Sequence, residues 1–373
     1  NSYNNPPYPD KVINLTATPA DKSAILNWDA NIEADLKKYI IYQSTVTGFT
    51  PAVEDSIDEV AAGTNTYTAT GLTNRATYYY RLLAVNTVGN VGDFSDEAAV
   101  MPEYLGPEWW VSLDGNDGND GDEANPYANI STAINRAEDG HIIKVKTGTY
   151  KGQNANTNLF NSNKSLTFIG VDGPENTILD AEEMNVHFGF YSDNQDKHVK
   201  VRGFTLKNGS GGQGGSMDVS NLGSLKIENC IFQNNYSDGW GGALRITYTK
   251  VTVDSSIFFN NQAREEGGAI AWEGSKDDSI FISNTNFNGN YVRSNISNDI
   301  HGGALDLDVW GENSFALVED CVFRNNWLEH TSGNWASGAG IHGGWSENGI
   351  VEIHRSIFQG NQIRSNSGSG AAF

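Results

Sequence analysis

The chain has 373 residues, too many for one ordinary domain, and carries a formal net charge of −22 at pH 7. This acidity excludes nucleic acid and anionic membranes as partners that charge would favour, since both would repel the protein. No apolar run approaches membrane-spanning length, which predicts that this chain does not cross a membrane. The 41 glycines and the periodic apolar residues predict a turn-rich, all-β protein and not a disordered one.

Residues 9–102 predict a β-sandwich, because short alternating segments follow one another at regular spacing without a helical pattern. We expect its strands at 12–17, 24–28, 39–42 and 78–86. These segments resemble a fibronectin type III module, in which Trp28 would be the buried tryptophan and Tyr78 the corner tyrosine. Asn74 stands where that family has a proline. The resemblance implies a spacer or presenting module, and residues 103–108 are expected to link it to the next domain.

Residues 109–373 predict a parallel β-helix, whose leading segment and cap occupy 109–150. This part begins with a loop rich in Asp, Asn and Gly, whose carboxylates could hold a hard cation such as Ca²⁺. The candidate ligands are Asp114, Asp117, Asp120 and Asp122. Gly118 falls where an EF-hand would need an oxygen ligand. A turn held by hydrogen bonds from side chains to the backbone is therefore an equal alternative.

A short amphipathic helix is predicted over 130–137, with Asn129 or Ser131 as its N-terminal cap. Its apolar face would consist of Ile130, Ala133, Ile134 and Ala137. Strand segments follow at 141–150 and 165–170. This order of loop, helix and strands resembles the N-terminal part of secreted right-handed β-helix proteins. In such proteins the helix covers an end of the solenoid that would otherwise expose its core and its unpaired strand edges.

Residues 199–373 repeat two short phrases, which predicts stacked structural units. The first phrase, F-x-x-N, occurs at Phe232–Asn235, Phe258–Asn261, Phe287–Asn290, Phe323–Asn326 and Phe358–Asn361. The second, similar to G-G-A-[IL], occurs at Gly241–Leu244, Gly267–Ile270, Gly302–Leu305, Gly338–Ile341 and Gly368–Ala372. Each unit contains three short alternating segments, so we expect three strands per coil of a right-handed parallel β-helix.

Aligning the coils places equivalent residues in columns along the axis. The Phe residues of F-x-x-N would form a core stack, and the Asn residues a ladder of amides at a turn. Cys230 and Cys321 share a column three coils apart, which separates them by about 14 Å at roughly 4.8 Å per coil. Because a disulfide needs Cα atoms within about 7 Å, we expect two buried free thiols.

The ordered pair of phrases resembles the repeats of chlamydial polymorphic outer membrane proteins and of related bacterial surface proteins. The resemblance covers about 199–373 and implies surface display and adhesion, hence an extracellular or bacterial cell-surface location. No secretion signal opens the sequence, so the chain would be cytoplasmic, or a mature form or fragment of a longer protein. Gly368–Phe373 reads as the first strand of a further coil, which favours a monomeric fragment of a larger surface protein.

The register also gathers candidate chemistry on one outward face. Glu273 should lie beside Asp308, and Asp306 beside His342, because they occupy equivalent positions in adjacent coils about 4.8 Å apart. A solvated acidic surface would explain these residues. So would a calcium site, or the paired carboxylates of a retaining glycosidase.

Aromatic residues near turns predict a carbohydrate-binding strip, since exposed aromatic faces stack on the apolar faces of sugars. Trp327 and Trp335 are expected in a long loop at 327–337, and Tyr291 at the start of another at 291–301. The remaining members would be Trp310 and Trp345, in equivalent turns. Packing over turns is the alternative for all five residues. Trp272 aligns with inward-facing residues and is assigned to the core.

We therefore expect a secreted or cell-surface, adhesin-like protein that binds glycans or other surface ligands without catalysis. Binding would use loops on one edge of the β-helix, where the longest insertions fall. One alternative is a β-helix polysaccharide lyase or glycoside hydrolase, because the fold supports both. The other is a structural spacer of a larger surface protein. Ligand binding without turnover would favour the adhesin-like protein over both alternatives.

Overall fold

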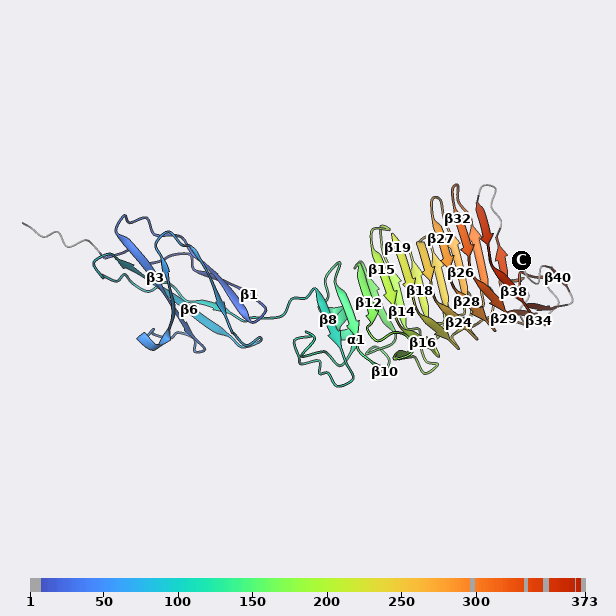
Figure 1. The fold of residues 1–373 in the computed structure, drawn as a ribbon, viewed down its shortest axis with the longest axis horizontal. Coiled ribbons are helices and arrows are strands. Elements are labelled where there is room, and N and C mark those ends of the chain that lie inside the picture. The colour runs from blue at the N-terminus through green and yellow to red at the C-terminus, as the bar shows by residue number, and fades with distance from the viewer. Residues whose placement is uncertain (1–7, 296–298, 332–334, 345–348, 366, 370–373) are drawn as a thin grey trace, which may run out of the picture. The chain divides into compact units, whose positions relative to one another are not determined.

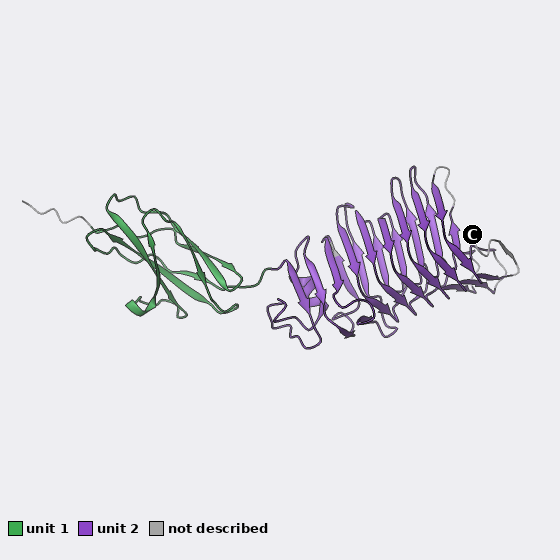
Figure 2. Cartoon of the chain, viewed as in Figure 1, with its two compact units in different colours: residues 1–105 green, residues 106–373 purple. Residues whose placement is uncertain are grey.

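A computed structural model describes the chain except for residues 1–7, 296–298, 332–334, 345–348, 366 and 370–373. The chain divides into two compact units, residues 1–105 and 106–373 (Figure 2). Strands dominate both units, and no helix in the described part is long and apolar enough to span a membrane.

The first unit is a sandwich of two antiparallel sheets. One sheet contains, in order, β1 (Thr16–Ala20), β2 (Ser23–Asn27) and β5 (Thr66–Thr70). The other contains β4 (Ser56–Ala61), β3 (Leu36–Ser44), β6 (Tyr78–Asn86) and β7 (Ala98–Val100), with a short 3₁₀ turn at Val53–Asp55. The predicted sandwich is therefore present, although the first strand begins at Thr16, four residues later than the pattern at 12–17 suggested.

Alternation along these strands explains the core of the first unit. Trp28 is buried and packs edge-on against Tyr39, with ring centroids 5.5 Å apart. The hydroxyl of Tyr78 accepts a hydrogen bond of 3.0 Å from the backbone N–H of Thr73. This contact ties the turn before β6 to the strand, as expected of a corner tyrosine.

The second unit is a parallel β-helix, in which each coil pairs with the next along the axis (Figure 1). Sheet I contains β8 (Glu108–Val111), β9 (Ile142–Val145), β12 (Leu166–Gly170), β15 (His198–Arg202), β19 (Ser224–Glu228), β23 (Lys250–Asp254), β27 (Ser279–Ser283), β32 (Phe315–Glu319) and β37 (Ile350–His354). Sheet II contains β10 (Gly148–Tyr150), β13 (Thr177–Asp180), β16 (Thr205–Lys207), β20 (Ile231–Gln233), β24 (Ile257–Phe259), β28 (Asn286–Asn288), β33 (Val322–Arg324) and β38 (Ile357–Gln359).

Three further sheets complete the coils. Sheet III consists of short strands, namely β17 (Ser210–Gly211), β21 (Tyr236–Ser237), β25 (Gln262–Ala263), β29 (Tyr291–Ser294), β34 (Trp327–His330) and β39 (Gln362–Arg364). Sheet IV contains β11 (Leu159–Ser162), β14 (Phe188–Tyr191), β18 (Met217–Ser220), β22 (Leu244–Thr247), β26 (Ile270–Gly274), β31 (Leu305–Val309) and β36 (Ile341–Gly343). The wing sheet contains β30 (Ile300–His301), β35 (Trp335–Ser337) and β40 (Ser367–Ser369).

The expectation of three strands per coil is wrong, because sheet III adds a fourth between sheets II and IV. Its strands are only two residues long in several coils, too short to show a period in the sequence. The predicted loops at 291–301 and 327–337 are also largely strands of sheet III and the wing sheet. The wing sheet encloses a second, smaller hydrophobic core, formed by Ala263, Val292, Ile300, Leu328, Ala336 and Ala339.

The predicted stacks are confirmed. Successive F-x-x-N rings from Phe232 to Phe358 lie 4.7 to 5.0 Å apart and within 10° of parallel. The Asn of each coil uses its Oδ1 to accept the backbone N–H and side-chain Nδ2–H of the Asn in the coil before it. Cys230 and Cys321 are buried free thiols.

Helix α1 (Ile130–Arg136) covers its end of the solenoid with Ile130, Ala133 and Ile134, all buried. Asn129 is the N-cap residue, but its side chain makes no capping hydrogen bond. Instead Oδ1 of Asn156 accepts the N–H of Ile130 at 2.9 Å. The cap thus comes from a residue 26 positions away, which local sequence cannot indicate.

The last G-G-A phrase, Gly368–Ala372, does not have the register that the aligned phrases predict. Gly368 pairs with Ala336 in the wing sheet and so does not occupy the position of the turn glycine Gly338. The expected register for this phrase, Gly368–Ala372, was therefore wrong. Its end, from 370 onward, lies outside the described residues.

We predict that the Asn ladder is a main source of stability. Asn261→Ala should lower the free energy of unfolding by about 2–4 kcal/mol, because it leaves backbone groups buried without partners. Chemical denaturation measures this change. Asn260→Gly is the matched control, since Asn260 has φ of 54° and Gly occupies the equivalent left-handed position at Gly289. Equal losses in the two variants would contradict a special role for the ladder.

A second prediction concerns pH. His187 is buried, with Nδ1 3.0 Å from Ser216 Oγ and Nε2 3.0 Å from the carbonyl oxygen of Leu179. Burial lowers the pKa of His187 to about 4. Between pH 6.5 and 4, the unfolded chain therefore binds a proton at this residue, whereas the folded chain does not. Stability should therefore fall between pH 6.5 and 4, by up to about 3 kcal/mol from this group.

Calorimetry of the native chain and of His187→Gln across this range tests the assignment. The variant starts less stable, but its stability should decline less as the pH falls. If both proteins show the same pH dependence, then His187 is not responsible.

Candidate functional site

The outer face of sheet IV carries a row of aromatic and charged residues along the axis. In the described register, Asp306 pairs with Ala271 and His342, and Glu273 pairs with Asp308, as the aligned phrases predict. Earlier coils contribute Arg245 and Asp218, joined by an ion pair of 3.0 Å. Tyr191 donates to Asp218 at 2.9 Å, and Tyr248 donates to Glu273 at 3.0 Å.

Asp306 is only 2% exposed, so this face is not the fully solvated acidic surface that one interpretation expected. It shares a hydrogen bond of 2.6 Å between its Oδ1 and Nδ1 of His342. Glu266, in the turn between β25 and β26, lies close enough to Asp306 for each carboxyl group to shift the pKa of the other. Glu266 forms backbone bridges to Trp240 and His301, which fixes it beside the start of β31.

Burial governs the protonation of this cluster. It raises the pKa of Glu266 to about 9, and the nearby carboxylates of Asp306 and Asp308 add to the shift. Burial likewise raises the pKa of Asp306 well above its usual range, with Asp308 contributing. It raises the pKa of Asp308 against the opposing hydrogen bond from Trp310. Three acidic groups therefore share a space in which full ionisation is unfavourable.

The imidazoles beside the cluster are displaced in the opposite direction. Burial lowers the pKa of His301 to about 4 and the pKa of His342 below its ordinary value. The two rings stack with centroids 4.3 Å apart and planes 17° from parallel. His301 Nδ1 also lies 2.9 Å from Oγ of Ser337. Burial therefore disfavours the protonated form of both rings, and the stacking contact fixes their orientation.

A small cavity lies at this cluster. Its walls include Trp240, Trp272, Glu266, Asp306 and Asp308. Its volume is about 10 Å³, enough for one water molecule or one ion. A sugar ring does not fit.

A larger hollow, the aromatic groove, lies where sheets II and III meet. It has a volume of about 490 Å³ and is open along one side. Its lining consists of Asn234, Asn235, Tyr236, Asn260, Gln262, Gly289, Tyr291 and Trp327. Two of the predicted ligand-binding residues, Tyr291 and Trp327, thus belong to one groove.

The aromatic residues of this groove form part of a column. Tyr291 and Trp327 stack with centroids 4.1 Å apart and planes 7° from parallel. The guanidinium of Arg364 lies 4.8 Å from the ring centroid of Trp327. The face of Tyr291 that is turned away from Trp327 points towards the coil of Gln262, which also lines the groove. Tyr236, one coil beyond Gln262, limits the groove at the other end.

The other predicted aromatic residues lie elsewhere. Trp310 is 59% exposed and directly follows β31. Trp335 is 48% exposed on the wing sheet. Trp345 lies outside the described residues. Trp272 is buried, and its Nε1 donates to the carbonyl oxygen of Thr249 at 3.1 Å, so its assignment to the core is confirmed.

The Asp-rich loop is held by its own hydrogen bonds. Oδ1 of Asp117 accepts the backbone N–H groups of Ala128 and Asn129, both at 3.0 Å. Oδ1 of Asp122 accepts the N–H of Asn125 at 2.7 Å. These contacts shape the turn, and the described coordinates do not gather Asp114, Asp117, Asp120 and Asp122 around one point. The loop matches the Asx-turn alternative.

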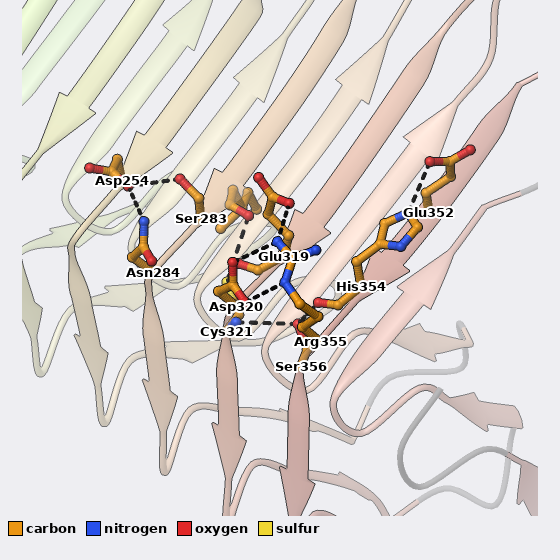
Figure 3. A network of polar contacts seen from close by, with 11 residues as sticks. Asp254, Ser283, Asn284, Glu319, Asp320, Cys321, Glu352, His354, Arg355 and Ser356 are labelled. Carbon is orange, nitrogen blue, oxygen red and sulfur yellow. Dashed lines mark hydrogen bonds and ion pairs between the residues drawn. The ribbon is translucent and has the colours of Figure 1, made fainter.

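Ion pairs on sheet I form a separate network, shown in Figure 3. Arg355 donates to Glu319 and Asp320 at 2.7 Å, and Nε2 of His354 lies 3.0 Å from Glu352. Most of these side chains are well exposed to solvent, so the network contributes little to stability and encloses no site.

The sequence reasoning missed Glu266, His301, Tyr236 and Gln262. Each occupies a column that the phrases define. Glu266 and His301 directly precede a G-G pair, and Tyr236 and Gln262 directly follow the Asn of F-x-x-N. Reading these flanking columns would have identified all four residues.

No protein-family model and no curated protein matches the chain. Similar solved structures cover about a quarter of it and match the first unit. An Fn3-like protein from Clostridium thermocellum is 25% identical, with a TM-score of 0.22 over 26% of this chain and 95% of that one. The Clostridium perfringens spore cortex lytic enzyme SleM is 16% identical, with a TM-score of 0.21 over 25% of this chain and 28% of the enzyme. A β-1,2-glucanase from Parabacteroides distasonis is 19% identical, with a TM-score of 0.23 over 27% of this chain and 13% of the enzyme.

Proposed function

We propose that this is a secreted or cell-surface protein that binds a carbohydrate polymer in the aromatic groove without cleaving it. The observation that carries the proposal is that Tyr291 and Trp327 line one open groove together with amide side chains. Rings supply apolar contact to a sugar, and amides supply both donors and acceptors for its hydroxyl groups. This combination is typical of sites that bind carbohydrates.

The shape of the groove favours a polymer. Its lining comes from four successive coils, so it extends along the axis of the solenoid. Gln262 occupies a position that is aromatic at Tyr236 and Tyr291 on either side. The coils of Tyr236 and Tyr291 are about 9.6 Å apart. Between them the Tyr291 hydroxyl donates a hydrogen bond to Oε1 of Gln262. One sugar would lie beside Gln262. Further sugars would continue along the axis on either side.

The repeat type supports the same function. The F-x-x-N and G-G-A-[IL] phrases resemble those of chlamydial polymorphic outer membrane proteins and other bacterial surface proteins, which favours surface display and adhesion. The fibronectin III-like unit suits a spacer that would hold the β-helix away from the surface to which the protein is attached. The proposal is for binding without cleavage, since rings and amides line the aromatic groove and paired carboxylates do not.

Screening the full chain against a panel of polysaccharides and a glycan array tests the proposal. We expect at least one polysaccharide to bind. Trp327→Ala and Tyr291→Ala should each weaken this binding about 10-fold, because each removes an aromatic wall. Titration calorimetry measures the affinity. Trp335→Ala is the matched control, as this exposed tryptophan lies outside the groove, and it should bind normally.

A further variant keeps the test informative if Trp327→Ala or Tyr291→Ala fails to fold. Gln262→Tyr places a bulkier side chain in the lining of the groove and extends the aromatic column, so it should abolish binding while preserving thermal stability. Failure of every polysaccharide to bind would contradict the proposal. So would normal binding by Gln262→Tyr together with loss of binding in Trp335→Ala, which would move the site to the wing sheet.

A further inference from the structure

A second site lies on sheet IV, apart from the aromatic groove. Asp306 and Asp308 are two positions apart in β31 and so lie on the same face of the strand. His342, on β36, is the register partner of Asp306. One ligand atom from each of these three residues lies within 4.8 Å of the other two. In the described chain this is the one group of His, Cys, Asp and Glu side chains with such convergence. The donors are two carboxylates and one imidazole.

The charge of this group is not balanced by the protein. Among described residues, no Lys or Arg forms an ion pair with Asp306, Asp308 or Glu266. Arg245 lines the same cavity, but its guanidinium is paired with Asp218. Buried carboxylates without a cationic partner are costly, and a bound cation removes that cost. The cavity beside Asp306 and Asp308 has room for a single ion, and His342 is not among its lining residues.

Contacts with neighbouring side chains hold the donors in place. Oδ1 of Asp306 lies 2.6 Å from Nδ1 of His342, and the indole of Trp310 lies near Asp308. The ring of His342 stacks on His301. Supporting contacts of this kind orient the ligands in metal sites and contribute to affinity. A solvated acidic surface needs none of them.

The geometry points to a binding site for one divalent transition-metal ion, such as Zn²⁺, held by Asp306, Asp308 and His342. Imidazole with carboxylates suits Zn²⁺ and its neighbours in the first transition row, whereas Ca²⁺ and Mg²⁺ prefer oxygen ligands alone. Three protein ligands leave a coordination position for water or for a group of a bound molecule. This site is distinct from the aromatic groove, so either can exist without the other.

Metal binding is tested on the full chain, purified without a polyhistidine tag and stripped with a chelator. Titration calorimetry with ZnCl₂ should show one ion bound per chain, with little competition from a large excess of CaCl₂. Substitution with Co²⁺ should give visible absorption bands that report the coordination number. The inference would be overturned if the protein bound no Zn²⁺, or if it bound Ca²⁺ as tightly as Zn²⁺.

Variants locate the ion. Asp308→Asn and His342→Ala should each weaken Zn²⁺ binding by about 100-fold or more, and Trp310→Phe, on an exposed supporting residue, by about 10-fold. The matched control is His354→Ala, which removes a histidine from the exposed His354–Glu352 pair on sheet I (Figure 3) and should leave binding unchanged. Circular dichroism checks that each variant is folded. Equal affinity in Trp310→Phe, His342→Ala and His354→Ala would place the ion elsewhere.

Discussion

The β-helix depends on one constraint, the strict register between successive coils. Each coil must satisfy its backbone hydrogen bonds with the coils on either side, and the Asn ladder adds buried amide bonds at the corner between sheets II and III. A shift by one residue would break this ladder and turn every inward side chain outward. The constraint therefore fixes which residues from distant parts of the sequence become neighbours.

Both candidate sites follow from this register. In the aromatic groove, Gln262 interrupts a column that is otherwise aromatic, and its Oε1 accepts a hydrogen bond from the hydroxyl of Tyr291. In the Asp306 site, adjacent coils bring Asp306 and His342 into contact although 36 residues separate them. The stacking that builds the core thus also concentrates polar and aromatic side chains on its surface. What differs between the coils, and not what repeats, distinguishes the two sites.

The phrases allowed much of this arrangement to be predicted. They indicated the Phe stack, the Asn ladder, the free thiols and the pairing of Glu273 with Asp308, because a fixed register is sufficient for each. They did not indicate sheet III, whose strands are too short to have a recognisable period. They also missed the burial of Asp306, which is 2% exposed. The second core under the wing sheet is made of ordinary small and aliphatic residues, with no sequence signal of their partners.

The sequence by itself determined the class of fold, the coil register and the residues that share a column, since these follow from local alternation and from the repeat. Only the tertiary structure decided which of those columns are open and which are enclosed. Tyr291 and Trp327 border a groove, whereas Asp306 and Asp308 face a cavity of atomic size. The physical reason is that exposure depends on how insertions pack across several coils. Nothing in one repeat specifies that packing. The packing decides whether an aromatic residue is accessible to a ligand and whether a carboxylate is exposed to water.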